Sequence, residues 1–76
     1  MDVYTPVNTS PNAITRAIEG KNKQATAILV QASIGEADMA KVAARTWGKP
    51  TAKNIQTIFF QKQDGSFVFY NRPKGG

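Results

Sequence analysis

The last third of the chain carries the pattern that most restricts how this protein folds. Residues 54–72, NIQTIFFQKQDGSFVFYNR, contain two runs rich in β-branched and aromatic residues on either side of Asp64 and Gly65. Asp-Gly is a preferred pair for the two-residue type I′ turn that joins antiparallel strands. The pattern therefore predicts a β-hairpin at the end of the fold.

A two-residue loop also sets the register of this hairpin, because Gln63 then pairs with Ser66. Opposed residues point to the same side of a sheet, and this ladder opposes Phe60 to Phe69, Phe59 to Tyr70 and Thr57 to Arg72. It predicts a core face with Ile58, Phe60, Phe67 and Phe69. The other, mixed face carries Ile55, Thr57, Phe59, Gln61, Val68, Tyr70 and Arg72. A slip of one residue would scramble this assignment.

Three further elements are predicted before the hairpin. Ser10 is a good N-cap and Gly20 a good helix stop, so the residues from Pro11 to Glu19 are predicted to form a helix. The short apolar run from Ala25 to Gln31 is bounded by polar residues and predicts a buried strand. The alanine-rich segment from Glu36 to Trp47 has acids in its first turn and bases later, which predicts a second helix.

The order of these elements predicts the fold class and the domain organisation. Helix, strand, helix, strand, strand is an α+β order, with two helices packed on a small, mainly antiparallel sheet. A length of 76 residues gives one domain. Residues 1–9, rich in Thr, Pro and Asn, are predicted to be an irregular lead-in, and residues 10–76 are predicted to be the single domain.

The composition excludes several chemistries. The chain has no cysteine and no histidine, which excludes a thiolate nucleophile and the usual acid–base group near neutral pH. Its five acids are scattered, so neither a metal site nor a paired-carboxylate site is predicted, and no cofactor is expected. The net charge of +5 favours an anionic partner such as nucleic acid, a membrane surface or an acidic protein.

Neither a signal peptide nor a membrane-spanning run is visible in the sequence. The N-terminus lacks the charged start and apolar stretch of a signal peptide. No apolar run approaches the roughly 18 residues that span a bilayer. Either the protein is cytosolic, or it is a piece of a larger protein that supplies the export signal.

Three groups of polar residues are candidates for a binding site. Lys21, Lys23 and Gln24 precede the first predicted strand, where they would hold a phosphate and orient a ribose hydroxyl; a solvated loop is the alternative. Thr57, Tyr70 and Arg72 share the mixed hairpin face, where arginine binds phosphate and tyrosine stacks a base; ordinary exposed strand residues are the alternative. Arg45, with Lys41 and Lys49, flanks the second helix, and Lys53 extends the basic track; a solvated helix face is the alternative.

The chain resembles the C-terminal tRNase toxin domains of CdiA-type contact-dependent growth inhibition proteins. These belong to the wider group of barnase-, EndoU-, colicin- and RelE-like ribonucleases. The resemblance lies in NAITRAIEGKNKQATAILV, where a helix ends in a Lys-x-Lys-Gln-Ala turn into a strand. It continues through EADMAKVAART and IQTIFFQKQDGSFVFYNR and spans roughly residues 10–72.

This resemblance implies a bacterial toxin domain that is exported as the C-terminal part of a larger surface protein. Such domains cleave tRNA in the cytoplasm of a target cell and are blocked by a cognate immunity protein. Some relatives also need a host factor such as elongation factor Tu, and the resemblance leaves that open here.

The absence of histidine excludes a histidine acid–base mechanism but leaves RNA cleavage possible. The 2′-OH of RNA is its own nucleophile, so an enzyme needs to align it and to stabilise charge on the phosphoryl oxygens. We expect metal-independent cleavage that leaves a 2′,3′-cyclic phosphate. The expected catalytic residues are Lys23, Gln24, Thr57, Tyr70 and Arg72, and the expected RNA-binding residues are Lys21, Arg45 and Lys53.

Two other functions remain open from the sequence. A non-catalytic RNA- or DNA-binding module would show salt-dependent binding without turnover. Such a module would be expected to interleave several exposed aromatic residues on one sheet face. A small protein inhibitor of a host enzyme would instead dock its basic surface on an acidic partner.

Overall fold

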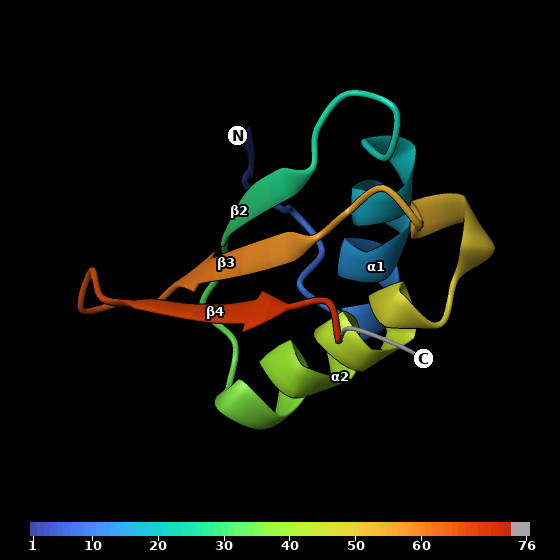
Figure 1. Cartoon of the computed structure of the whole chain (residues 1–76). Helices are drawn as coiled ribbons and strands as arrows, with labels where there is room; N and C mark the ends of the chain where they lie inside the picture. The colour runs from blue at the N-terminus through green and yellow to red at the C-terminus, as the bar shows by residue number, and fades with distance from the viewer. Residues whose placement is uncertain (74–76) are drawn as a thin grey trace.

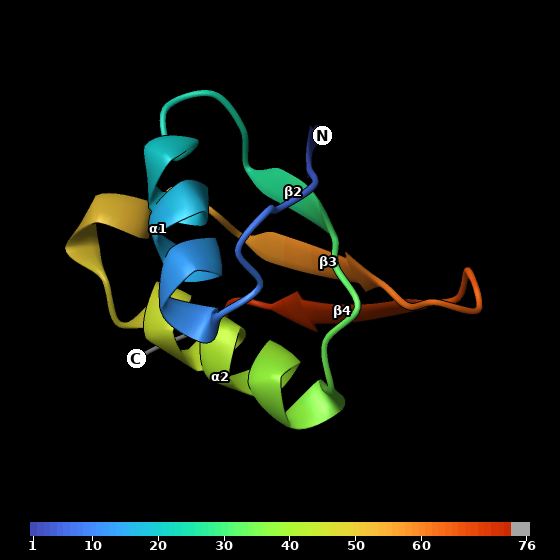
Figure 2. The same ribbon diagram turned by 180° about the vertical axis from the view of Figure 1, so that it is seen from behind.

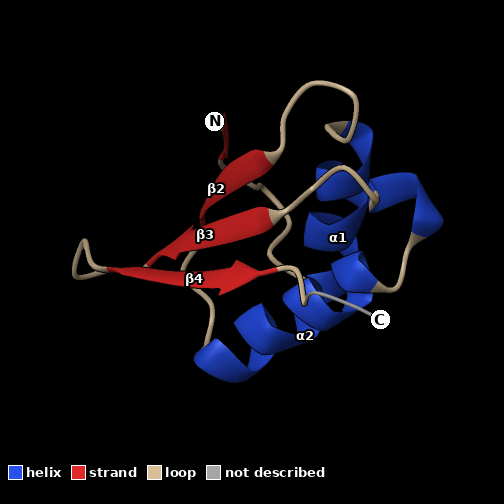
Figure 3. Ribbon diagram, viewed as in Figure 1, coloured by secondary structure: helices blue, strands red, loops and turns tan. Residues whose placement is uncertain are grey.

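The computed structural model describes residues 1–73 as two helices packed on a four-stranded sheet (Figures 1 and 3). In chain order the elements are β1 (Asp2–Tyr4), α1 (Pro11–Gly20), β2 (Ala27–Gln31), α2 (Glu36–Trp47), the 3₁₀-helix η1 (Pro50–Ala52), β3 (Thr57–Gln61) and β4 (Phe67–Asn71). The α+β class is confirmed. No helix within the described part of the chain is long and apolar enough to cross a membrane.

The sheet is mixed, with the spatial order β1-β2-β3-β4. β1 pairs parallel with β2, β2 pairs parallel with β3, and only β3 and β4 are antiparallel. The prediction of a mainly antiparallel sheet is therefore wrong. The reason is the helix between successive strands, since a crossover of this length returns the chain in the same direction and produces a parallel pair.

The prediction that residues 1–9 form an irregular lead-in is also wrong in part. Asp2–Tyr4 forms the edge strand β1, with Asp2 opposite Ile28 and Tyr4 opposite Val30. Three residues carry too little hydrophobic pattern to predict a strand. β1 exists because its backbone groups pair with β2, which is a long-range contact.

Both helices cover the same face of the sheet, as the two opposite views show (Figures 1 and 2). The two crossovers step across the sheet in the same direction, and right-handed crossovers of that kind place successive helices on one side. The other face of the sheet has no covering element among residues 1–73. We call it the open face.

The core lies between the helices and the covered face. The buried apolar side chains are Ile14 and Ile18 of α1, Ile28 and Val30 of β2, Met39, Val42 and Ala43 of α2, Ala52 of η1, and Ile58 and Phe60 of β3, with Ala32 and Ile55 from the connections. Both helices begin and end near the predicted residues. Ser10 caps α1 by accepting a hydrogen bond from the Ala13 N–H at 3.2 Å, as a capping serine does.

The hairpin forms as predicted, but its register is one residue away from the prediction. The pairs are Thr57 with Asn71, Ile58 with Tyr70, Phe59 with Phe69, Phe60 with Val68 and Gln61 with Phe67. Val68 and Tyr70 therefore pack against the core. Phe67 and Phe69, predicted for the core, lie on the open face with 56% and 59% of their surface exposed.

The turn chemistry explains this slip. The loop has three residues instead of two, because the Lys62 N–H donates to the Ser66 carbonyl at 2.8 Å and the Gly65 N–H donates to the Lys62 carbonyl at 3.0 Å. Among residues 1–73, Gly65 alone has a positive φ, of 86°. The carboxylate of Asp64 accepts hydrogen bonds from the N–H and hydroxyl of Ser66. A type I′ turn needs a positive φ at both central residues, Asp64 and Gly65. In the three-residue loop only Gly65 has a positive φ, and the hydrogen bonds from Ser66 to the Asp64 carboxylate stabilise this loop.

Candidate nucleic-acid interface

Two loops meet at the edge of the sheet where β2 and β3 begin. Because these strands are parallel neighbours, the segments that lead into them lie side by side. The Asn54 N–H donates to the Asn22 side-chain oxygen at 2.8 Å, and the Asn54 amide nitrogen donates to the Asn22 carbonyl at 3.3 Å. The Gln56 N–H donates to the Thr26 carbonyl at 2.7 Å. These bonds hold the two loops together.

An open cavity of about 760 Å³ lies at this edge. We call it the amide cavity, because asparagine and glutamine side chains dominate its wall. It is lined by Met1, Asp2, Asn22, Lys23, Gln24, Ala25, Thr26, Asn54 and Gln56. Two of the predicted site residues, Lys23 and Gln24, are in this wall and exposed.

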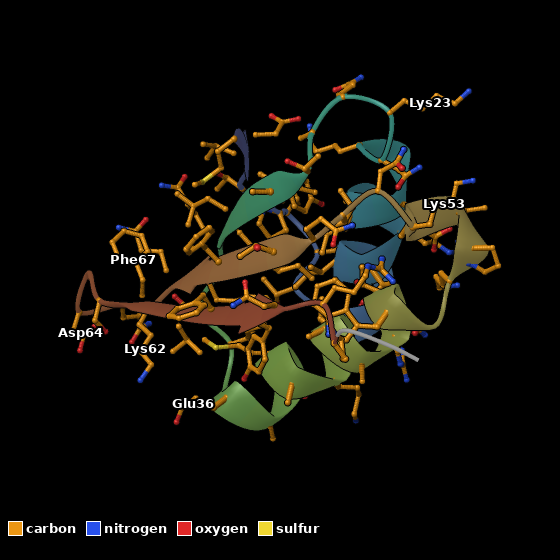
Figure 4. All side chains as sticks on the ribbon, viewed as in Figure 1. Lys23, Glu36, Lys53, Lys62, Asp64 and Phe67 are labelled. Atoms are coloured by element: carbon orange, nitrogen blue, oxygen red, sulfur yellow. The ribbon has the colours of Figure 1, made fainter. Side chains whose placement is uncertain are left out.

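Three lysines of the described part of the chain lie around the amide cavity. Lys23 is in its wall, and Lys53 precedes the cavity residue Asn54. Figure 4 shows Lys23 and Lys53 at the same end of the molecule, both pointing outward. The ammonium of Lys21 lies 3.0 Å from the carboxylate of Asp2, another wall residue. Lys21 is thus beside the cavity, with its charge already paired.

The structure does not bring Arg72 to this cavity. Its guanidinium donates to the carbonyls of Ile55 at 2.9 Å, Ala52 at 2.6 Å and Trp47 at 3.3 Å. Its central carbon lies 4.9 Å from the centroid of the Trp47 ring. These contacts join the end of β4 to the ends of α2 and η1, so they explain Arg72 as a structural residue. They use three of the five N–H donors of the guanidinium within the fold.

Tyr70 is also separated from the other predicted residues. The register slip turns it to the covered face, where it is half-buried and meets Phe60 edge-on at 5.8 Å. The prediction that Tyr70 shares a face with Thr57 is therefore wrong. Thr57 lies on the open face, where its hydroxyl donates to the Asn71 side-chain oxygen at 2.9 Å.

Arg45 lies away from the amide cavity. It donates to the Asn12 side-chain oxygen and lines a different cavity of about 410 Å³ between α1 and α2, with Arg16 and Lys49. Lys49 is 3.2 Å from the carboxylate of Glu19. The predicted basic track along the second helix therefore belongs to the helix layer and not to the loop edge.

Two carboxyl groups among residues 1–73 have a lowered pKa. A hydrogen bond from Thr51 and the nearby Lys49 hold the pKa of Glu19 below its usual value. Hydrogen bonds from Ser66 likewise lower the pKa of Asp64 in the hairpin loop. Neither carboxylate lines the amide cavity, so both shifts concern stability and not a site.

The open face carries a row of apolar side chains across all four strands. The register aligns Val3, Leu29, Phe59 and Phe69, and Phe67 is two residues away on β4. An apolar cavity of about 330 Å³, which we call the apolar slot, is lined by Met1, Leu29, Phe59, Phe67 and Phe69. Figure 4 shows Phe67 on the side of the strands away from Glu36 of α2.

Polar side chains flank the apolar row of the open face. The Thr5 hydroxyl donates to the Gln31 side-chain oxygen at 2.8 Å, and the Gln31 amide donates to the Gln61 side-chain oxygen at 3.0 Å. On the other side of the row lies the pair of Thr57 and Asn71. Amide and hydroxyl groups therefore border the apolar row on both sides.

Sequence reasoning missed Asp2, Asn22, Thr26, Asn54 and Gln56 as cavity residues. A signal for the loop pairing was present, since the pattern Lys-Asn-x-Gln occurs twice, at 21–24 and at 53–56. Each copy leads into one of the two parallel strands. Only the parallel pairing of β2 and β3, however, makes the two copies neighbours.

Among residues 1–73, no cluster of acidic, histidine or cysteine side chains could hold a metal ion. Comparison of this chain with models of protein families, with characterised protein sequences and with solved structures finds no match. The function must therefore be argued from the site itself.

Proposed function

We propose that this domain is a metal-independent ribonuclease that binds RNA at the amide cavity and cleaves it through the RNA's own 2′-OH. The observation that carries the proposal is the pairing of Asn22 with Asn54. It brings the exposed Lys23 and four side-chain amides to one open cavity, beside the exposed Lys53, on a protein of net charge +5. The resemblance to CdiA-type tRNase toxins supports the same function.

The chemistry of the wall suits a ribose-phosphate segment. Lysine is a compact cation that binds phosphate oxygens, and Lys23 and Lys53 are both exposed at this edge. Side-chain amides both donate and accept, so Gln24 and Gln56 suit ribose hydroxyls and base edges. No metal is needed in this proposal, because the cations supply the positive charge.

The cleavage step uses the one carboxylate among the described cavity residues. In the proposal Asp2 accepts the proton of the 2′-OH while the 2′-oxygen forms a bond to phosphorus. The bond from phosphorus to the 5′-oxygen breaks, and that oxygen takes a proton from water. The hydroxide formed takes the proton from Asp2, which restores the carboxylate. Lys23 stabilises the negative charge on the phosphoryl oxygens. The products are a 2′,3′-cyclic phosphate and a 5′-hydroxyl.

The ion pair of Lys21 with Asp2 gives Lys21 a positioning role in this scheme. It replaces the direct RNA contact predicted for Lys21 from the sequence. Thr57 lies next to the cavity residue Gln56 and remains a candidate to orient the ribose. The catalytic roles predicted for Tyr70 and Arg72 are not carried into the proposal, because both side chains are engaged elsewhere.

The biological setting rests on the resemblance alone. In this proposal the fold belongs to the barnase-, EndoU-, colicin- and RelE-like group, and the substrate is tRNA. The domain reaches a target-cell cytoplasm as the C-terminal part of a larger exported surface protein, and a cognate immunity protein blocks it. Elongation factor Tu is a candidate host factor.

The test is the incubation of total tRNA with the domain in EDTA. Discrete fragments with cyclic-phosphate ends are expected, and Lys23→Ala should reduce the cleavage rate at least tenfold. Lys41→Ala is the matched control, because it removes the same charge from an exposed position on α2. Cleavage that appears only after addition of cell extract would show a required host factor. Intact tRNA under both conditions would overturn the ribonuclease proposal.

A specific observation favours the second candidate, a non-catalytic RNA-binding module. Such a module is expected to expose several aromatic residues on one sheet face, and the structure places Phe59, Phe67 and Phe69 on the open face. It would bind RNA with a steep dependence on salt and would leave the RNA uncut. The tRNA experiment separates the two functions.

A further inference from the structure

The open face carries large apolar side chains that are exposed to solvent. Phe67 and Phe69 are each more than half exposed, and Val3 is 52% exposed. The rings of Phe59 and Phe69 lie 6.0 Å apart and are tilted by 40°, so they do not bury each other's faces. A contiguous exposed apolar patch of this kind marks a binding surface.

The open face also carries no charged side chain on its strands. Its outward residues on the described strands are Val3, Ala27, Leu29, Gln31, Thr57, Phe59, Gln61, Phe67, Phe69 and Asn71, none of which is ionisable. The nearest cations of the candidate site, Lys23 and Lys53, belong to the loop edge. Charged groups of a ligand would therefore bind at the loop edge, and its uncharged groups would bind on the open face.

The apolar slot and the amide cavity adjoin each other. Met1 lines both of them, so one ligand can extend from the polar edge onto the apolar face. Single-stranded RNA has the matching division of chemistry, with charged phosphates on one side and uncharged, flat bases on the other. Aromatic side chains on a sheet are a common platform for such bases.

We propose that the open face binds the bases of a single-stranded RNA segment whose phosphates lie at the amide cavity. Phe59 and Phe69 stack the base next to the bound phosphate, and Phe67 stacks a base further along the strand. Gln61 and Asn71 border the stack and hydrogen-bond to base edges. This inference deepens the proposed function by naming its substrate class as unpaired RNA, because paired bases in a helix cannot reach a flat platform.

The test measures binding of a fluorescent uridine octamer with 2′-O-methyl riboses, which cannot be cleaved by 2′-OH attack. The comparison ligand is an oligomer of the same length and backbone without bases. The wild-type domain should bind the uridine octamer at least tenfold more tightly than the abasic one. Phe69→Ala and Phe67→Ala should each weaken octamer binding roughly fivefold or more and leave abasic binding unchanged.

Two controls define the interpretation. Val7→Ala removes a fully exposed apolar side chain outside the strands and should change neither affinity. Lys23→Ala should weaken binding of both ligands, because it acts on the phosphate. Both phenylalanines are largely exposed, so their alanine variants should keep the circular dichroism spectrum of the wild type.

Several results would overturn this inference. Equal wild-type affinity for the two ligands, or full octamer affinity in Phe69→Ala, would show that bases do not bind this face. A wild-type dimer that becomes a monomer in Phe69→Ala would show that a second copy covers it. If any of these results is found and tRNA is still cleaved, the inference fails and the ribonuclease proposal stands. Intact tRNA together with base-dependent octamer binding would refute cleavage and support this inference.

Discussion

Arg72 lies over the ring of Trp47 at 4.9 Å and also donates a hydrogen bond to its backbone carbonyl. The same guanidinium bonds the carbonyls of Ala52 and Ile55. One side chain thus satisfies three carbonyls where α2, η1 and the lead into β3 converge. Planar arginine supplies these donors in a fixed arrangement that lysine lacks.

We expect Arg72→Ala to lower the free energy of unfolding by about 2–4 kcal/mol, because it removes charge-assisted hydrogen bonds and the contact with Trp47. Arg72→Lys should recover only part of this loss. Urea unfolding followed by circular dichroism measures both. Arg45→Ala is the control, since its bond to Asn12 is exposed. A fully stable Arg72→Ala that fails to cleave RNA would return Arg72 to the functional site.

Asn54→Ala tests whether loop pairing creates the amide cavity. It removes the side-chain bond to the Asn22 carbonyl, and the exposed position predicts a stability loss of only about 1 kcal/mol. RNA cleavage or binding should fall by a larger factor, because Lys23 and Lys53 lose their relative placement. Gln63→Ala, at an exposed amide in the hairpin loop, should leave activity unchanged. Equal activity of the two variants would contradict this view of the cavity.

Gly65→Ala should destabilise the domain by roughly 1 kcal/mol, because the residue has a φ of 86° that L-residues with a Cβ adopt at a cost. Gly20→Ala is the matched control. Gly20 is the last residue of α1, and a Cβ there meets nothing within 4 Å. Alanine should stabilise it by up to about 1 kcal/mol. Thermal unfolding should therefore shift in opposite directions for the two variants.

The acid dependence of stability should include a contribution from Glu19. Its pKa is lowered in the folded state, first by the hydrogen bond from Thr51 and also by Lys49. A lowered folded pKa gives stability that is present above the unfolded value of 4.5 and is lost as pH falls through the folded value. Wild type should therefore lose more stability than Thr51→Val between about pH 6 and pH 3. Parallel pH profiles of the two proteins would contradict this assignment.

Local patterns in the sequence are sufficient to predict the helices and the existence of the hairpin. The second helix is predicted at Glu36 to Trp47 and is found there, and the first differs only by including Gly20. Caps, stops and apolar spacing act within a few residues, which is why they can be read along the chain. The same kind of pattern predicts Lys23 and Gln24 in the loop that leads into a strand, and both residues line the amide cavity.

The pairing of distant segments follows from the tertiary structure and not from local patterns. β1 becomes a strand through hydrogen bonds with β2, and the two Lys-Asn-x-Gln loops become neighbours through the parallel pairing of β2 and β3. The hairpin loop is one residue longer than predicted. Because side chains alternate along a strand, Phe67 and Phe69 therefore lie on the open face and not in the predicted core. Local sequence patterns are sufficient to predict the two helices, the hairpin and the basic loop. The long-range backbone pairing decided which side chains share a surface, because no local pattern encodes register between segments far apart in the chain.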